Sequence, residues 1–596
     1  MEYSRPMVST FFTTQLRRFA RFAPGVAIGV ALAFGVAVQN DAAANETFTP
    51  KVLSAADADL YRDIFDLQVD GDWRAADAKI KALTDRVLMG YVLEQRYMHP
   101  TAYRSTYDEL RAWLSSYADH PQADGIYRLA LKRRPRGANA PVRPIARSWR
   151  AAPDWELPPS LVEDYAKVGE PQAKRIEGRV RYLCKREEAL TALDEIDGHL
   201  RARRITVRQY DRMRSWIAAS LYFQGYLAKA REIAIEAAAQ NGEVAVLAHW
   251  IEGLIAYREG DVRGALSAFD AMAAIEHQED SLRAAAGFWA ARAALAAGAL
   301  DRVAPNLEIA AARPLTFYGQ LALSQLGRDH VFDWTPPSMT ESQFTVFAAD
   351  FPETRRIVAL KDAGRDADAD LELRRLHGRA KDASNATLLA LAAALDLPAA
   401  QIDIALAEND ATYAAGLFPV PSFQPSDGFK TDRAVLYALI RQESKFKPEA
   451  KSRVGARGLM QVMPRTASYV AKDRRLATSA GRDLLFDPGL NLKIGQMYVN
   501  YLLEAIDDGD LFEVATAYNG GPGNLRRWKA QLGIDDPLLF IESIPNSESR
   551  DYVEKVLTNI WIYRQRLGQP TPSRDRVAAG EAPVYEALDK LIEDAR

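Results

Sequence analysis

One glutamate stands where the periodicity of its own helix points toward the protein interior. In the stretch TDRAVLYALIRQESKF, the residues Val435, Leu439 and Glu443 fall at positions i, i+4 and i+8. Leu436 and Ile440 lie beside them on the same apolar stripe. We expect a carboxyl group there to be partly desolvated, so its pKa should rise and it could donate a proton to a leaving group near neutral pH. The alternative is that Glu443 only ends its helix near the surface.

Further motifs follow this helix in a definite order. The chain reads QESKFKPEAKSRVGARGLMQVMP over 442–464, AYNGGPG over 517–523 and IESIPNSESRDYV over 541–553. Each motif alone is weak evidence, but together, in this order and spacing, they resemble the catalytic domain of the soluble lytic transglycosylases. Members of that family are relatives of goose-type lysozyme and cleave peptidoglycan glycan strands.

The resemblance implies that Glu443 is the single general acid and base. Ordinary glycosidases use two carboxylates, but we find no second acid in a comparable setting, and Asp473 and Asp487 lie in loop-like sequence. In this family the N-acetyl group of the muramic sugar assists departure of the leaving sugar from C1. The C6 hydroxyl then attacks C1 in place of water. The β-1,4 bond between N-acetylmuramic acid and N-acetylglucosamine would break non-hydrolytically and leave a 1,6-anhydromuramic end.

The same resemblance assigns five substrate-binding residues. Ser452 should bind the acetamido or lactyl region of muramic acid, while Gln461 and Met463 should line the cleft wall beside the scissile bond. Met463 could equally be a core methionine on residue type alone. Tyr518 should form a hydrogen bond near Glu443 or the N-acetyl group, and Glu542 matches an acid in the cleft.

The sequence departs from the family pattern at one point, and two further expectations concern residues near the motifs. The family usually has an aromatic residue after Ile-Pro and a threonine after the next glutamate, whereas this chain reads Ile544-Pro545-Asn546-Ser547-Glu548-Ser549. This change puts the preference at one subsite in doubt. Asn519 is expected to cap its helix end, with Gly520 in the left-handed conformation. We predict no cofactor and no metal site, because DDGDLFE at 507–513 lacks the ligand spacing of an EF-hand.

Composition narrows the class of protein. A length of 596 residues, with 48% hydrophobic and 26% charged residues, is typical of a globular protein with several domains. The net charge of −3 includes no basic run that would predict nucleic-acid binding. Cys184 is the only cysteine, so the sequence excludes an internal disulfide, a cysteine-rich metal site and a lipid-bearing cysteine near the N-terminus. The expected partner is the peptidoglycan glycan strand, bound by a monomer; the sequence identifies no partner within the cell-wall machinery.

The N-terminal segment has the pattern of an export signal. Arg17, Arg18 and Arg21 precede the apolar run 23–38, and Ala42-Ala43-Ala44 offers small residues for cleavage. Removal of 1–44 would take away four arginines and two acids and move the net charge from −3 to −5. We therefore expect a soluble periplasmic protein without an integral membrane domain. An uncleaved membrane anchor is the alternative, and the surrounding residues fit a twin-arginine signal poorly.

The middle of the chain predicts an all-α fold. Turn signals at Gly225-Tyr226, Gly260-Asp261 and Gly298-Ala299 recur at a spacing close to that of the tetratricopeptide repeat. In the best copy, LAHWIEGLIAYREGDVRGALSAFDAM, Gly253 predicts a tight contact and Phe269 a packing aromatic. The alternative is a generic alanine-rich helical array. Either way each helix pair must bury its apolar face on its neighbours, which produces a curved solenoid, and the family resemblance implies a ring-shaped one.

The predicted order of domains is a signal peptide at 1–44, a superhelical repeat domain at 45–335, a helical linker domain at 336–418, a lysozyme-like and mainly α catalytic domain at 425–565 and a C-terminal tail at 566–596. Pro336-Pro337 and the proline-rich stretch 418–428 mark the two internal breaks. The arginine- and proline-rich stretch 131–156 is interpreted as a solvated loop, with an arm that contacts acidic wall polymers as the alternative.

Three functional hypotheses follow. The leading one is a periplasmic lytic transglycosylase that acts from the ends of glycan strands, although the sequence does not separate exo from endo cleavage or define the peptide-stem preference. The second is a hydrolytic muramidase that uses the same glutamate. The third is a repeat-based scaffold with a vestigial catalytic domain, against which the intact Glu443, Ser452, Gln461 and Tyr518 argue.

Overall fold

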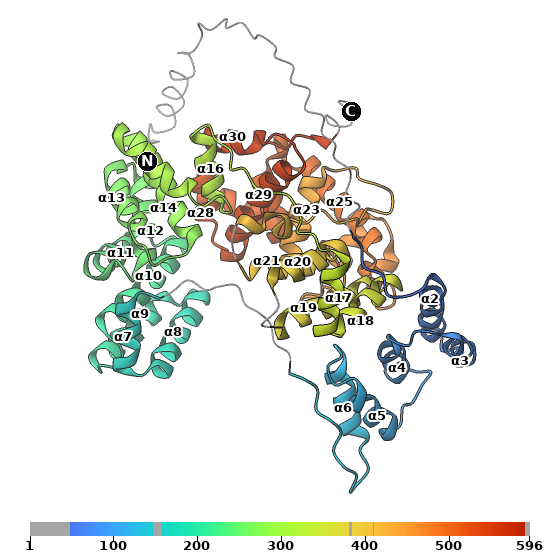
Figure 1. Cartoon of the computed structure of the whole chain (residues 1–596). Helices are drawn as coiled ribbons and strands as arrows, with labels where there is room; N and C mark the ends of the chain where they lie inside the picture. The colour runs from blue at the N-terminus through green and yellow to red at the C-terminus, as the bar shows by residue number, and fades with distance from the viewer. Residues whose placement is uncertain (1–47, 147–156, 381–383, 409–410, 590–596) are drawn as a thin grey trace, which may run out of the picture.

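The fold is helical throughout the part of the chain that the structure describes. The computed structural model describes residues 48–146, 157–380, 384–408 and 411–589 (Figure 1). Strand-like pairing in these ranges is limited to isolated bridges, Lys451 with Arg457, Arg457 with Val462, and Asp510 with Val584. The prediction of an all-α fold is therefore confirmed. The predicted signal peptide, 1–44, lies outside the described residues.

Within α2–α6 and within α7–α16, which precede the Pro336-Pro337 break, helices near one another in sequence pack together, as a solenoid requires. In Figure 1, α7–α15 stand on one side of the molecule and α2–α6 on the other. The elements are α2 (Ala55–Val69), α3 (Trp73–Ala82), α4 (Met89–Tyr97), α5 (Tyr107–Ser116), α6 (Ala123–Arg133), α7 (Pro159–Val168), α8 (Glu170–Lys185), α9 (Ala189–Arg201), α10 (Val207–Phe223), α11 (Leu227–Asn241), α12 (Val246–Glu259), α13 (Val262–Ala273), α14 (Asp280–Ala297), η1 (Leu300–Arg302), α15 (Val303–Ala311) and α16 (Phe317–Gln325).

The pair α12 and α13 shows why the repeat pattern needs its particular residues. Gly253 faces the ring of Phe269 so closely that a Cβ atom would lie 2.4 Å from it. Gly260 ends α12 at a φ of 82°, and the Asp261 side chain then accepts a hydrogen bond from the backbone N–H of Gly264 at the start of α13. The tight contact, the turn and the packing aromatic predicted from this repeat are confirmed.

A second group of helices packs against the first helices of the chain. It comprises α17 (Glu341–Asp350), α18 (Glu353–Asp362), α19 (Asp366–Arg379), α20 (Asn385–Ala394), α21 (Pro398–Leu406), η2 (Ala411–Tyr413) and α22 (Ala414–Leu417). Residues of α17–α21 share one hydrophobic core with residues of α2–α4. A carboxylate oxygen of Asp362 accepts the backbone N–H groups of Val52 and Leu53, both at 2.9 Å. The helices that follow the Pro336-Pro337 break thus pack on the first described helices of the chain.

The rest of the described chain forms mostly short helices together with the long helices α25 and α29, and several of them begin with proline. The elements are α23 (Arg433–Glu443), α24 (Pro464–Val470), η3 (Arg474–Ala477), η4 (Arg482–Phe486), α25 (Pro488–Ala505), η5 (Asp507–Gly509), α26 (Leu511–Gly520), α27 (Pro522–Leu532), α28 (Pro537–Ser543), α29 (Ser547–Arg566) and α30 (Pro572–Ala578). Proline suits the first helical turn because its φ is fixed and its missing N–H would have no partner within the helix. The domain boundaries given above stay predictions.

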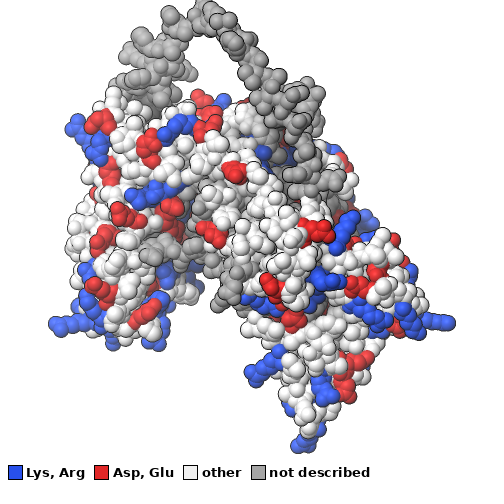
Figure 2. Space-filling view, in the orientation of Figure 1, with Lys and Arg blue, Asp and Glu red and all other residues white. Residues whose placement is uncertain are grey.

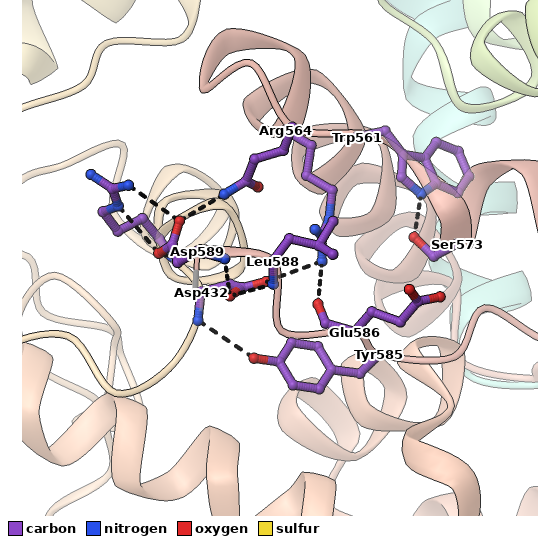
Figure 3. Close-up of polar contacts among 10 residues, drawn as sticks. Asp432, Trp561, Arg564, Ser573, Tyr585, Glu586, Leu588 and Asp589 are labelled. Atoms are coloured by element: carbon purple, nitrogen blue, oxygen red, sulfur yellow. Dashed lines mark hydrogen bonds and ion pairs between the residues drawn. The ribbon is translucent and has the colours of Figure 1, made fainter. Parts of the chain in front are cut away.

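The start of α23 is held by the last described residues of the chain (Figure 3). The carboxylate of Asp432 accepts the backbone N–H groups of Leu588 at 2.9 Å and Asp589 at 3.1 Å, and pairs with Arg564 at 3.2 Å. Asp589 in turn accepts the backbone N–H of Arg433 at 2.8 Å, one of the N-terminal donors that α23 cannot satisfy itself. Residues 585–589, within the predicted tail, therefore form a strap across the beginning of the helix that carries Glu443.

Charges of both signs are interspersed on the face shown in Figure 2, and no continuous field of one sign covers it. Of the stretch 131–156, residues 131–133 end α6, 134–146 run without regular structure and 147–156 lie outside the described residues. Among the helices that the structure describes, none is long and apolar enough to cross a membrane.

Candidate active site

Glu443 is the last residue of a helix that is buried on almost every side. Val435 and Leu439, which share its stripe, are 2% and 3% exposed. Immediately after Glu443 the chain turns sharply, because Lys445 and Phe446 both adopt positive φ, at 49° and 60°. Phe446 is itself buried and anchors this turn in the core. The fold thereby presents a partly exposed carboxyl group at the end of an apolar helix.

The surroundings of Glu443 keep its carboxyl group half protonated near neutral pH. Burial raises the pKa of Glu443 to about 7; a hydrogen bond from Tyr552 opposes this rise, and the negative charge of Glu548 adds to it. The Tyr552 hydroxyl donates to a carboxylate oxygen of Glu443 at 2.6 Å. A carboxyl group with this pKa can both give up and take back a proton, as the position on the apolar stripe predicts.

Tyr518 packs beside this pair without bonding to Glu443. Its ring stacks on that of Tyr552 with centroids 6.4 Å apart and planes at 10°. Its hydroxyl donates to the backbone carbonyl of Met460 at 2.8 Å, and the hydrogen bond to Glu443 itself comes from Tyr552; a contact of Tyr518 with the N-acetyl group stays a prediction. Burial raises the pKa of Tyr518 well above its usual value, and the nearby charge of Glu443 raises it further. Tyr518 thus ties the site to the loop at 458–461.

Asn491 and Gly458 fix the conformation of that loop. The buried amide of Asn491 accepts the N–H of Met460 at 2.8 Å and donates to the carbonyls of Arg457 and Leu485 at 2.9 and 2.8 Å. Gly458 has a φ of 77°, and a Cβ there would lie 2.3 Å from both the Asn491 amide and the Leu485 carbonyl. Only glycine fits this position without a shift.

Three predicted substrate contacts lie on the loop around residues 452–463. The Gln461 amide donates to the carbonyls of Ala450 at 2.9 Å and Gly458 at 2.8 Å, so its donors hold the loop together. Ser452 Oγ accepts the backbone N–H groups of Gly455 and Ala456 at 3.1 and 2.9 Å, which leaves its hydroxyl proton for another acceptor. Met463 is 37% exposed just before α24, so it is not a core methionine.

Glu542 lies in a different setting, buried between the superhelix and the helices that follow it. It is 6% exposed and accepts a hydrogen bond from Tyr318 of α16. Burial raises its pKa to about 7, a rise that the Tyr318 hydrogen bond and the charge of Arg550 oppose. A carboxyl group enclosed in this way has no free face for a sugar. We therefore leave Glu542 out of the proposed site.

Two residues on α29 complete the site and were not selected from the sequence. Glu548 and Tyr552 are spaced i and i+4, so both act from one face of the helix that begins with Ser547. This i, i+4 spacing within SESRDYV is the sequence signal that could have predicted that both side chains belong to the site. The departure at Asn546 has a physical role, because its side chain caps α29 by accepting the N–H of Ser549 at 2.9 Å.

The expected cap at the end of α26 needs a correction. Gly520 is the last helical residue, and Gly521, at a φ of 85°, turns the chain instead. The Asn519 side chain accepts a hydrogen bond from the Ser549 hydroxyl at 2.7 Å, so it joins α26 to α29.

Among the described residues no group of three or more His, Cys, Asp or Glu is placed to hold a metal ion.

Comparison with known proteins agrees with this arrangement. Residues 421–539 match the family described as "Transglycosylase SLT domain". We refer to this region, residues 421–539, as the SLT domain after the family that it matches. The soluble lytic murein transglycosylase of Salmonella typhimurium is 42% identical over 133 residues, which is 22% of this chain and 20% of that protein. The match thus spans about a fifth of the length of this curated relative.

Solved structures extend the likeness beyond the SLT domain at the level of fold. The 70-kDa soluble lytic transglycosylase of Escherichia coli aligns with a TM-score of 0.54 and 19% identity, covering 86% of this chain and 97% of that one. An inactive Glu→Gln mutant of the lytic transglycosylase Slt from Pseudomonas aeruginosa aligns with a TM-score of 0.50 and 18% identity, over 86% and 97%. The likeness of fold to these two proteins therefore extends over most of the chain. Glu548 and Tyr552 lie beyond the residues that the SLT family matches.

Proposed function

We propose that this protein is a lytic murein transglycosylase. It would cleave the β-1,4 bond between N-acetylmuramic acid and N-acetylglucosamine and leave 1,6-anhydromuramic ends, with Glu443 as the single acid and base. The observation that carries the proposal is the carboxyl group of Glu443, which is held by Tyr552 at 2.6 Å and has a pKa of about 7. The SLT domain match and the name of the Salmonella typhimurium relative support the substrate class.

The proposed reaction needs one proton to leave Glu443 and another to return. The protonated carboxyl donates to the glycosidic oxygen as the bond to the muramic C1 breaks, while the carbonyl oxygen of the sugar's own N-acetyl group supports C1. The resulting carboxylate then takes the proton of the C6 hydroxyl, whose oxygen attacks C1 and displaces the acetamido oxygen. No water is consumed, and Glu443 ends the cycle protonated. The Tyr552 hydroxyl keeps the carboxyl oriented through both steps.

The direct experiment is digestion of purified sacculi by the whole protein and by Glu443→Gln. The wild type should release muropeptides with anhydro ends, and the variant should release none while keeping the helical circular dichroism of the wild type. The Pseudomonas aeruginosa relative was solved as an inactive Glu→Gln mutant, which is consistent with this expectation. Full activity of Glu443→Gln would refute the assignment of the acid, and it would equally refute the scaffold hypothesis.

Hydrolysis by the same site is the second candidate. Glu548 favours it, because its negative charge acts on Glu443 and a second carboxylate could activate a water molecule. The two reactions give products that differ by the mass of one water at the muramic end. Mass spectrometry of fragments from sacculi therefore separates them, and free reducing ends as the main product would replace the transglycosylase assignment with a muramidase.

We also propose a periplasmic location, because the proposed murein substrate would be met there. Export depends on residues 1–44, which lie outside the described residues, so it stays a prediction. Cell fractionation combined with N-terminal sequencing of the mature protein would test it: a periplasmic product that begins near residue 45 supports a cleaved signal. A full-length product in the membrane fraction would support an anchor.

A further inference from the structure

A continuous row of tyrosine rings runs from the catalytic acid to the protein surface. Tyr552, which bonds to Glu443, is followed by Tyr518, Tyr498, Tyr501 and Tyr469. The successive ring centroids are 6.4, 5.2, 6.3 and 5.7 Å apart. These rings come from α29, α26, α25 and α24, so the packing of four helices assembles the row.

Exposure increases along this row. Tyr552 is 4% exposed, Tyr518 and Tyr498 are partly buried, Tyr501 is 39% exposed and Tyr469 is 67% exposed. Single exposed tyrosines are ordinary, and Tyr226 on the superhelix is one. The outer pair differs because two exposed rings touch each other, nearly at right angles, and continue directly into the site.

We propose that Tyr469 and Tyr501 form an outer sugar-binding subsite for the same murein glycan strand that the SLT domain cleaves. This proposal rests on the proposed function. A pyranose ring presents a face of C–H groups that packs on an aromatic ring, while its hydroxyls reach the ring's polar edge. Tyrosine supplies both surfaces with little loss of conformational entropy. The outer pair would thus bind a sugar of the same strand that lies several sugar units away from the bond whose oxygen Glu443 protonates.

The charges around the outer pair fit a murein strand. Arg526 on α27 is exposed, and its positive charge acts on the hydroxyl of Tyr501, where it opposes the rise in pKa that the hydrogen bond with Tyr469 causes. Muramic acid carries a lactyl group and, in the wall, an acidic peptide stem. A guanidinium at the edge of the subsite can pair with such a carboxylate, whereas the tyrosine faces contact the sugar itself.

Binding in an inactive background tests the subsite separately from catalysis. The whole protein with Glu443→Gln is titrated calorimetrically with stem-free murein glycan strands of defined length. We expect Tyr469→Ala combined with Tyr501→Ala to weaken binding of long strands about tenfold. The double Phe variant should retain most of the affinity, and Tyr226→Ala on the superhelix should change nothing. Thermal unfolding of each variant reports whether the SLT domain remains folded.

Two results would overturn the subsite. One is equal affinity of the double Ala variant and its parent for long stem-free strands. The other is a loss of affinity that appears only with stem-bearing strands, which would mean that the pair binds peptide instead. Failure of the proposed function would be observed in the digestion experiment, in which the wild-type protein would then cleave no sacculi. Length-dependent binding that requires the two rings would support the subsite even then.

Discussion

Replacing Glu443, the proposed catalytic acid, should stabilise the protein at neutral and alkaline pH. The pKa of Glu443 is raised from 4.5 to about 7 in the folded state by burial. A group whose folded pKa is raised contributes its full stability below pH 4.5, and this contribution is lost as the pH climbs through 7. Glutamine has the shape of the protonated acid and does not ionise. Glu443→Gln should therefore escape a penalty that the wild type acquires as the pH rises from 4.5 to about 7 and keeps at higher pH.

The size of this effect follows from the two pKa values. A change from 4.5 to about 7 corresponds to about 3 kcal/mol once both states are ionised. Because Glu443 remains in partial contact with solvent, we expect about 2 kcal/mol to be observed. For a unit the size of the SLT domain, this raises the unfolding temperature by about 4–8 °C at pH 8.

Differential scanning calorimetry of the two proteins between pH 4.5 and 8 measures the effect. The unfolding temperatures should nearly coincide at pH 4.5, separate as the pH rises to about 7 and differ by a constant amount from there to pH 8. Glu504→Gln, at an exposed position on α25, is the matched control and should follow the wild type at every pH. A constant difference between Glu443→Gln and the wild type across this range would show that Glu443 is not desolvated, and the reasoning about the acid would fail.

Three further predictions concern groups in and beside the SLT domain. Tyr552→Phe removes a hydrogen bond that lowers the pKa of Glu443, so the alkaline limb of the kcat/KM profile should move to higher pH. Glu548→Gln removes a charge that raises this pKa, so the same limb should move to lower pH, and shifts of both variants in one direction would contradict this electrostatic account. Gly458→Ala should destabilise the SLT domain by about 2 kcal/mol or more, because the new Cβ would meet the Asn491 amide and the Leu485 carbonyl, whereas Gly523→Ala, with open space around it, is the control in thermal unfolding. Arg292→Ala should cost about 3 kcal/mol in denaturant unfolding, because it leaves Asp536, paired at 2.6 Å, without its partner between α14 and α28, and an unchanged midpoint would show that this ion pair does not hold the superhelix to the SLT domain.

Local sequence signals predicted the fold better than they predicted the site. The repeat around Gly253 and Phe269 is specified by neighbours within one helix pair, so its turn and its tight contact could be derived from spacing. The raised pKa of Glu443 followed in the same way from the apolar stripe of α23. By contrast, the closure of α17–α21 onto α2–α4 depends on contacts between residues some 300 positions apart, such as Asp362 with Leu53, and no local pattern encodes it.

The errors at the site have one cause. Motif order identified which segments converge but not which side chain of each segment faces the acid. Glu542 and Glu548 lie in the same motif, yet Glu542 turns toward Tyr318 of the superhelix while the charge of Glu548 acts on Glu443. Tyr518 and Tyr552 are similarly close, and which hydroxyl reaches Glu443 depends on how α26 and α29 pack. That geometry belongs to the tertiary structure.

The strap at 585–589 has a consequence for the order in which the protein becomes functional. The helix that ends in Glu443 receives its N-terminal partners from residues up to 157 positions later in the chain. A nascent polypeptide that has already emerged as far as the acid still leaves Asp432 and the first helical N–H without their eventual contacts. We expect the proposed lytic activity to arise only after residues 585–589 have been synthesised, so a translation product that stops before them would not cleave the wall. Pulse-labelled chains halted before residue 585 should be protease-sensitive at 425–445, whereas chains that extend past 589 should resist.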